Sequence, residues 1–183
     1  MKSFRRVFRL LCLVVMLVIL SIAGYNIAMR YIYPLEMTDY VEKYSEEFGV
    51  DQSLVYAIIK CESGFEPGAK SSAGAVGLMQ LTEETFNDVR KMVGDGEEYT
   101  FSEDATDPEI NVKYGTRYLK FLLEFFDGDK VAAIAAYNAG MGNVQEWMDG
   151  KPTLNVEDIE FEETENYVKK VLTAEQKYLS LYD

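Results

Sequence analysis

The feature that most constrains this chain is an uninterrupted apolar segment near its N-terminus. Residues 10–29 (LLCLVVMLVILSIAGYNIAM) contain no charged side chain, and Arg9 and Arg30 bound them. A segment of about 20 apolar residues is long enough to cross the hydrocarbon core of a bilayer as one helix. The sequence therefore predicts one transmembrane helix, and the rest of the chain must build its own hydrophobic core.

The charges on the two sides of this segment are strongly asymmetric. Four basic residues precede it (Lys2, Arg5, Arg6 and Arg9), whereas all 31 acidic residues follow Arg30. Because basic flanks tend to stay in the cytoplasm, the asymmetry predicts a cytoplasmic N-terminus and an extracytoplasmic domain. We therefore expect a single-pass cell-membrane protein with a basic N-terminus (1–9), a signal-anchor (10–29), a linker (30–37) and one domain (38–183).

A cleaved signal peptide is the alternative interpretation of the same segment. Ser21-Ile22-Ala23 before Gly24 resembles a small-residue cleavage site, and cleavage there would give a secreted protein. We favour the uncleaved anchor because apolar residues continue past that point to Met29. Both interpretations export the domain. Cys12 is not preceded by a lipoprotein-type cleavage sequence.

Composition narrows the chemistry available to the domain. The chain has no histidine, which excludes Ser-His-Asp and Cys-His catalysis and most zinc and copper sites. The acidic loop 94–106 lacks the ligand spacing of an EF-hand, so we interpret it as solvated and predict no metal and no cofactor. From Arg30 onward the chain has 14 basic and 31 acidic residues, a net charge of −17, which argues against nucleic acid as a partner.

Helical periodicity and capping signals run through the rest of the chain, and we find no convincing strand. Thr38, Asp51 and Thr82 are candidate N-caps, and Asp107-Pro108 is typical of a helix start. These signals predict helices over 38–48, 52–62, 83–93, 108–126 and 130–137, a short helix around 144–148, and a final helix from about 163. We therefore expect an all-α domain.

One carboxylate stands out within the second predicted helix. Val55, Ile58, Ile59 and Glu62 fall at i, i+3, i+4 and i+7, so an acidic side chain continues an apolar stripe. Burial and the negative end of the helix dipole both raise the pKa of such a group. A carboxyl that stays protonated near neutral pH suits general acid chemistry on a glycosidic oxygen. The alternative is an exposed glutamate at a frayed helix end.

Four short motifs stand in order along the domain. They are Glu62-Ser63, Gly77-Leu78-Met79-Gln80, Ala136-Tyr137-Asn138-Ala139-Gly140, and Glu163-Thr164 followed by Tyr167-Val168. Each motif alone is weak, but together, over about Tyr40 to Tyr178, they resemble the lytic transglycosylase family of the soluble-transglycosylase type. The resemblance implies a lysozyme-like helical fold for the domain that follows the transmembrane helix.

The resemblance implies an enzyme that cuts peptidoglycan glycan strands between N-acetylmuramic acid and N-acetylglucosamine. Such an enzyme cleaves the β-1,4 bond without water and leaves 1,6-anhydromuramic ends. By the same resemblance Glu62 protonates the leaving oxygen and then acts as base for the muramic 6-hydroxyl. A hydrolytic lysozyme on the same fold and a non-catalytic glycan-binding scaffold are the alternatives. We further hypothesise that a tethered enzyme of this kind serves an envelope-spanning machine.

The resemblance also implies a set of substrate-binding residues. Ser63 is expected to hydrogen-bond near the carboxyl or an N-acetyl group. Met79 is expected to supply an apolar wall, and the Gln80 amide to bind sugar hydroxyl or acetamido groups. Tyr167 is expected to bring its hydroxyl to the catalytic carboxyl, with Glu163 supporting the same helix. The other expected cleft residues are Gly77, Leu78, Tyr137 and Asn138.

Overall fold

A computed structural model describes residues 2–96 and 98–182 of the chain. The side chains of Lys2, Ser3, Arg5 and Arg6 lie outside this description, and so does Glu97 of the acidic loop. Most side chains of the basic cluster that predicts the orientation are therefore outside this description.

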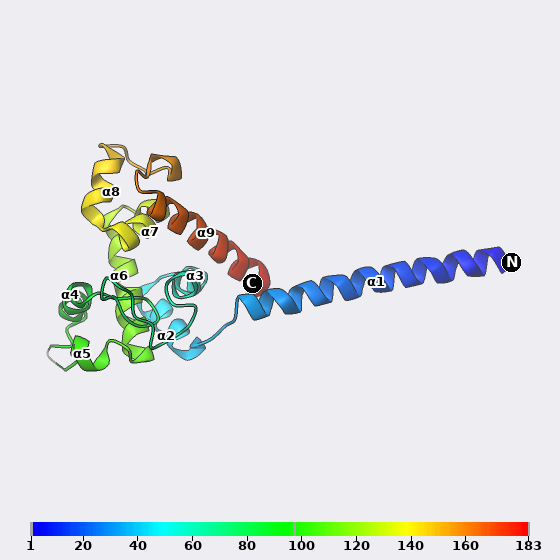
Figure 1. Ribbon diagram of the computed structural model, residues 1–183, viewed down its shortest axis with the longest axis horizontal. Helices are drawn as coiled ribbons and strands as arrows, with labels where there is room; N and C mark the ends of the chain where they lie inside the picture. Colours follow the sequence, from blue (N-terminus) through cyan, green and yellow to red (C-terminus); the bar gives the residue numbers. More distant parts are fainter. Residues whose placement is uncertain (1, 97, 183) are drawn as a thin grey trace.

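The N-terminal helix α1 (Lys2–Ile32) extends away from all the other helices as a single rod (Figure 1). Its segment Val7–Ile32 is long and apolar enough to cross a membrane, with a mean hydropathy of 2.7, and none of its apolar window is buried by the domain. The structure thus gives the apolar segment as one separate helix, and its insertion in a bilayer stays a prediction.

Helices also dominate the rest of the described chain, as predicted. Its helices are α2 (Thr38–Phe48), α3 (Gln52–Glu62), α4 (Glu83–Val93), α5 (Phe101–Asp104), α6 (Pro108–Phe125), α7 (Lys130–Ala139), α8 (Met141–Met148), the 3-10 helix η1 (Val156–Asp158) and α9 (Glu162–Tyr182). The described residues contain no strand, only two isolated β-bridges within residues 70–81. The fold class is therefore all-α.

Two packing relations organise the domain (Figure 1). The long helix α6 passes through its middle and contacts α2, α4 and α7. α3 lies antiparallel along α9, because Tyr56 stacks on Tyr178 at one end of the pair while Glu62 meets Tyr167 at the other. α7 packs against α6, α8 and α9, and so connects the helices around α6 with the α3–α9 pair.

Two of the predicted helix starts are confirmed in detail. The hydroxyl of Thr82 accepts a hydrogen bond from the Thr85 amide at 3.2 Å. The carboxylate of Asp107 accepts one from the Ile110 amide at 3.0 Å, and Pro108 is the first residue of α6. Such bonds satisfy backbone donors that have no partner inside the helix.

Other local predictions are wrong. Thr38 is the first helical residue of α2 rather than its cap; Met37 holds the cap position in a left-handed conformation without a side-chain bond. Asp51 does hold the N-cap position of α3 as predicted, but its carboxylate makes no capping hydrogen bond. The predicted loop 94–106 contains α5, a single turn of helix.

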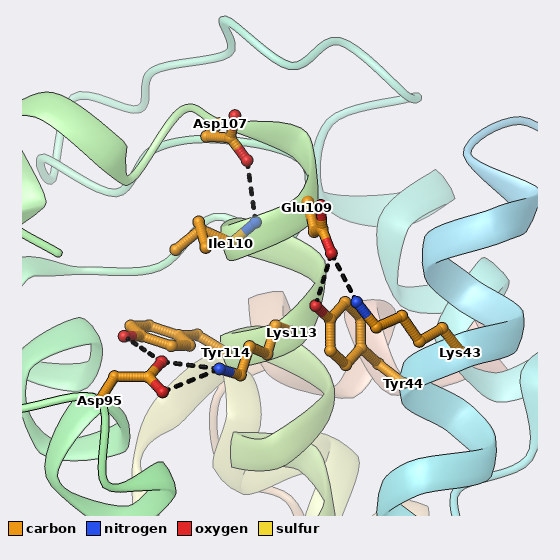
Figure 2. A network of polar contacts seen from close by, with 8 residues as sticks. All are labelled: Lys43, Tyr44, Asp95, Asp107, Glu109, Ile110, Lys113 and Tyr114. Atoms are coloured by element: carbon orange, nitrogen blue, oxygen red, sulfur yellow. Dashed lines mark hydrogen bonds and ion pairs between the residues drawn. The ribbon is translucent and has the colours of Figure 1, made fainter. Parts of the chain in front are cut away.

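The start of α6 is tied to α2 by a shared carboxylate (Figure 2). Glu109 accepts hydrogen bonds from the Lys43 ammonium at 2.7 Å and the Tyr44 hydroxyl at 2.8 Å. The ammonium is exposed and the pair with it contributes little stability, whereas the Tyr44 hydroxyl is partly buried. Glu109 therefore fixes the distance between the two helices mainly through Tyr44.

A second carboxylate ties α6 to the loop after α4 (Figure 2). Asp95 accepts bonds from the Lys113 ammonium at 2.7 Å and the Tyr114 hydroxyl at 2.9 Å. The Lys113 and Asp95 side chains are only 18% and 15% exposed. The prediction of a uniformly solvated acidic loop is therefore wrong at Asp95, because a cation and a phenol from α6 desolvate it.

The segment between α3 and α4 owes its shape to one buried amide on α6. Asn111 is fully buried, accepts a bond from the Met79 amide at 2.7 Å, and donates to the carbonyls of Ala105 at 2.7 Å and Val76 at 3.1 Å. Gly77 has φ of +83°, and a Cβ there would lie 2.1 Å from the Asn111 amide nitrogen. The close approach of the segment to Asn111 therefore requires glycine.

We predict that Asn111→Ala lowers the free energy of unfolding by about 2 to 4 kcal/mol, because it strands the Met79 amide and the Ala105 carbonyl without partners. Urea titration of the full chain in detergent micelles measures this loss. The exposed Asn155, bonded only to Asp158, provides the control: Asn155→Ala should cost less than about 0.5 kcal/mol. Equal losses in the two variants would contradict the role given to Asn111.

Candidate active site

The last residue of α3 and the second turn of α9 meet at a carboxyl–phenol pair. Glu62 is half-buried, and its Oε1 accepts a hydrogen bond from the Tyr167 hydroxyl at 2.5 Å. The two residues are 105 positions apart in sequence, and the antiparallel packing of α3 on α9 brings them together. The amphipathic pattern of α3 places Glu62 at the edge of the core, as its sequence spacing predicts.

Burial dominates the electrostatics of this pair. It raises the pKa of Glu62 from its ordinary value of 4.5 to about 7, and the hydrogen bond from Tyr167 opposes the rise. Burial, and after it the negative charge of Glu62, raise the pKa of Tyr167 well above its usual value. Near neutral pH, Glu62 therefore exchanges a proton readily while Tyr167 stays a neutral donor.

A second phenol stands beside the pair. The Tyr137 hydroxyl, at the end of α7, donates to the carbonyl of Met79 at 2.8 Å. Burial, followed by the charge of Glu62, raises the pKa of Tyr137 well above its usual value. The neighbouring thiol of Cys61 also has its pKa raised, to about 11, chiefly by burial. Cys61 therefore remains a neutral thiol and no nucleophile at neutral pH.

Ser63 and Gln80 hold the Gly77–Gln80 segment against the end of α3. The Ser63 hydroxyl donates to the Leu78 carbonyl at 2.8 Å. The Gln80 amide nitrogen donates to the carbonyls of Gly77 at 2.9 Å and Ala69 at 3.1 Å. Gln80 has a positive φ of 47°, which is costly for a residue with a Cβ, and these two bonds oppose that strain.

The structure changes two of the roles expected from the sequence. Met79 is fully buried, and its side chain packs so closely on α6 that a Cβ at Gly115 would lie 2.3 Å from the Met79 sulfur. It therefore fixes the segment from behind rather than forming an exposed wall. The Gln80 amide nitrogen is occupied by backbone carbonyls, so only its Oε1 is left for a sugar. Gly77 and Leu78 are buried as well.

A third link joins the ends of α7 and α9. The side-chain oxygen of Asn138, which is exposed, accepts a bond from the buried Thr164 hydroxyl at 2.7 Å. Glu163 is exposed in the first turn of α9, where a negative charge suits the helix dipole. The sequence motifs thus meet through hydrogen bonds that hold α3, the Gly77–Gln80 segment, α7 and α9 at one place.

Two of the residues that build this site were not assigned a role from sequence. Asn111 and Thr164 are both fully or almost fully buried, and each makes the side-chain hydrogen bonds described above. A polar residue on the apolar face of an amphipathic helix is the signal that could have identified Asn111. In residues 2–96 and 98–182, no three His, Cys, Asp or Glu side chains are grouped closely enough to hold a metal ion.

Comparison with known proteins identifies a family that this chain matches. The family described as the transglycosylase SLT domain matches residues 39–159. The soluble lytic murein transglycosylase of Escherichia coli K12 is 35% identical over 151 residues, which are 80% of this chain and 23% of that protein. The membrane-bound lytic murein transglycosylase C of Sodalis glossinidius is 42% identical over 116 residues, 57% of this chain and 31% of that protein.

Solved structures of such enzymes share the fold. The 70 kDa soluble lytic transglycosylase of Escherichia coli matches with a TM-score of 0.78 and 34% identity, covering 83% of this chain and 25% of that one. An inactive glutamate-to-glutamine mutant of the Pseudomonas aeruginosa enzyme matches with a TM-score of 0.75 and 31% identity, covering 81% of this chain and 25% of that one. This chain therefore spans about a quarter to a third of the length of these relatives.

The raised pKa of Glu62 makes a prediction about stability. Because the folded state holds this proton more tightly than the unfolded chain, stability falls as pH rises from 4.5 to about 7 and then stays level. Glu62→Gln removes the ionisation and should stabilise the protein by about 1 to 3 kcal/mol at pH 8, with little effect below pH 4.5. Urea titrations at the two pH values measure the difference. The exposed Glu47→Gln should show no such pH dependence.

The Tyr167 hydrogen bond makes a separate prediction. Since this bond lowers the pKa of Glu62, Tyr167→Phe should raise that pKa further above 7, as followed by NMR titration of the labelled Glu62 carboxyl. Tyr118→Phe, on α6, is the matched control, because the Tyr118 hydroxyl makes no bond to Glu62 among the described hydrogen bonds. An unchanged or lowered Glu62 pKa in Tyr167→Phe would show that Tyr167 does not stabilise the carboxylate.

Proposed function

Because this chain belongs to the transglycosylase SLT domain family, we propose that it is a membrane-anchored lytic transglycosylase of peptidoglycan. Its substrate is the β-1,4 bond between N-acetylmuramic acid and N-acetylglucosamine, and its product carries a 1,6-anhydromuramic end. The observation that carries this proposal is the half-buried Glu62, with a pKa of about 7, bonded to the neutral hydroxyl of Tyr167.

Glu62 acts first as a general acid. The protonated carboxyl gives its proton to the glycosidic oxygen as the bond from that oxygen to C1 of the muramic residue breaks. The bonding electrons leave with the oxygen, and positive charge develops at C1. A pKa of about 7 suits this step, because half of the molecules carry the proton at neutral pH and can still release it easily.

Glu62 then acts as the base that completes the reaction. Its carboxylate takes the proton from the muramic 6-hydroxyl, and the freed oxygen bonds to C1 to close the anhydro ring. The carboxyl regains its proton, and no water is consumed. Because Oε1 accepts the bond from Tyr167, the proton is carried by Oε2, which is left to face the substrate. Tyr167 thus orients the carboxyl and stabilises its charged form between the two steps.

Three observations favour this proposal over its alternatives. The relatives that this chain matches are named lytic transglycosylases rather than hydrolases, which favours the non-hydrolytic reaction. A non-catalytic scaffold has no need of a half-buried glutamate with a raised pKa, which costs stability above that pKa. In addition, the matched Pseudomonas aeruginosa enzyme is described as inactive when one glutamate is replaced with glutamine.

We also propose that α1 anchors the enzyme with its domain outside the cytoplasm. Three observations support this arrangement: the apolar length of α1, the basic residues on the N-terminal side of its apolar segment, and the membrane-bound relatives. Anchoring confines cutting to glycan near the membrane, which would suit an envelope-spanning machine that needs a local opening. Unaltered assembly of every such machine in a strain that lacks this chain would contradict that last point.

The test of the proposed reaction is digestion of purified peptidoglycan with the full chain in detergent micelles, followed by mass spectrometry of the new ends. We expect anhydromuramic ends from the parent, and Glu62→Gln should lower their rate of formation by at least about 100-fold. Glu47→Gln makes the same charge change at an exposed position of α2 and should keep the parent rate.

Each other outcome points to a different function. Reducing muramic ends would make the protein a hydrolase and call for a second carboxylate. Binding of glycan without cleavage by either protein would identify a scaffold. Full activity of Glu62→Gln would remove Glu62 from the mechanism.

A further inference from the structure

A cavity of about 490 Å³ lies between α3 and α9, beside the linker that follows α1. Its walls include Tyr33 of the linker, Lys60 and Cys61 of α3, and Lys169, Lys170 and Thr173 of α9. None of these side chains belongs to the carboxyl–phenol site described above. The cavity therefore needs an explanation of its own.

The charge of this cavity is opposite to that of the domain. The chain from Arg30 onward carries a net −17, yet three ammonium groups and no carboxylate line the cavity. Lys169 is paired with Glu165 at 2.5 Å, whereas the ion pairs found among the described residues include neither Lys60 nor Lys170. Burial, and after it the charge of Glu62, raise the pKa of Cys61, whereas Lys170 and Lys60 both act to lower it, so the two ammonium groups lie near the same wall of the cavity. The chemistry of the cavity therefore suits an anion.

The cavity is fixed at the end of the membrane helix. The Arg30 guanidinium donates to the Leu181 carbonyl at 3.0 Å and lies over the Tyr182 ring. The Tyr182 hydroxyl donates to the Tyr33 carbonyl at 2.8 Å, and the Tyr178 hydroxyl donates to the Pro34 carbonyl at 3.2 Å. Figure 1 shows the C-terminal end of α9 against the end of α1. The linker is thus clamped to α9 rather than free, and the cavity stays beside the anchor.

The end of the cavity beside Tyr33 lies at the height of a lipid headgroup. Tyr33 is four residues beyond Met29, the last residue of the apolar span, which is about 6 Å along a helix at 1.5 Å per residue. A bilayer carries a headgroup layer of about 5 to 8 Å beyond its hydrocarbon core. The Tyr33 ring lies 5.7 Å from that of Tyr178, and Lys170 is about 12 Å further along α9, so its long side chain extends back toward this layer from the far end of the cavity. A lipid phosphate therefore enters the cavity beside Tyr33.

We propose that this cavity binds the phosphate-bearing headgroup of an anionic lipid from the membrane that holds α1. The proposal rests on the anchoring proposed above and not on the reaction. A headgroup between Lys60 and Lys170 joins α3 to α9 next to the clamp, and Lys60 is two residues before Glu62. Bound lipid thereby sets how the domain stands on the membrane and at what height its site meets glycan.

The test uses the full chain in nanodiscs of phosphatidylcholine with phosphatidylglycerol at a ratio of 7 to 3. After gentle extraction, native mass spectrometry measures the ratio of the two lipids retained by the protein. We expect retention of phosphatidylglycerol well above its share of the nanodisc. The double variant Lys60→Gln/Lys170→Gln should lose roughly 25-fold of this preference, since each lysine near an anionic surface contributes about a factor of five.

Lys91→Gln/Lys120→Gln is the matched control, because it makes the same change of charge on α4 and α6. It should keep the parent preference, and equal thermal midpoints of the three proteins in phosphatidylcholine alone show that all are folded. An unchanged preference in Lys60→Gln/Lys170→Gln, or an equal loss in the control, would overturn the proposal. Displacement of phosphatidylglycerol by 10 mM inorganic phosphate would assign the cavity to free phosphate instead of lipid. Glu62→Gln should retain the lipid preference, which separates this result from failure of the proposed reaction.

Discussion

The antiparallel packing of α3 on α9 is the contact on which the rest of this structure depends. At one end of the pair it brings Tyr167 to Glu62 and partly shields the carboxyl from water, which is the main cause of its raised pKa. At the other end it stacks Tyr56 on Tyr178, whose hydroxyl holds the linker from the membrane helix. One helix pair therefore carries both the proposed catalytic carboxyl and the attachment to α1.

Side-chain hydrogen bonds to the backbone of the Gly77–Gln80 segment hold the site together. Asn111 holds the Met79 amide, Tyr137 holds the Met79 carbonyl, and Ser63 holds the neighbouring Leu78 carbonyl. Because each bond restrains a backbone atom, the segment is fixed before any substrate arrives. Holding a carboxyl with a raised pKa out of water costs stability. The fixed backbone around Glu62 prevents the side chain from turning into solvent to relieve that cost.

The charge of the domain bears on how it could contact a membrane. The strongly acidic domain has no overall attraction to anionic membrane lipids, so any such contact depends on a local basic site. The cavity beside Tyr33 is a site of that kind, and the clamp between α1 and α9 keeps it there. Anchor, clamp and cavity would together orient the domain, whereas a flexible tether would leave it free to rotate.

The sequence by itself determined most of the helices and the position of Glu62 on α3, because these depend on neighbouring residues. Thr82 and Asp107 mark their helices by local capping bonds, and the i, i+3, i+4, i+7 pattern places Glu62 on the buried face of α3. Only the tertiary structure decided the rest. It turned Met79 into the core, and it joined Asp95 to Lys113 and Tyr167 to Glu62. These outcomes depend on packing between residues far apart in the chain, and no local pattern encodes them.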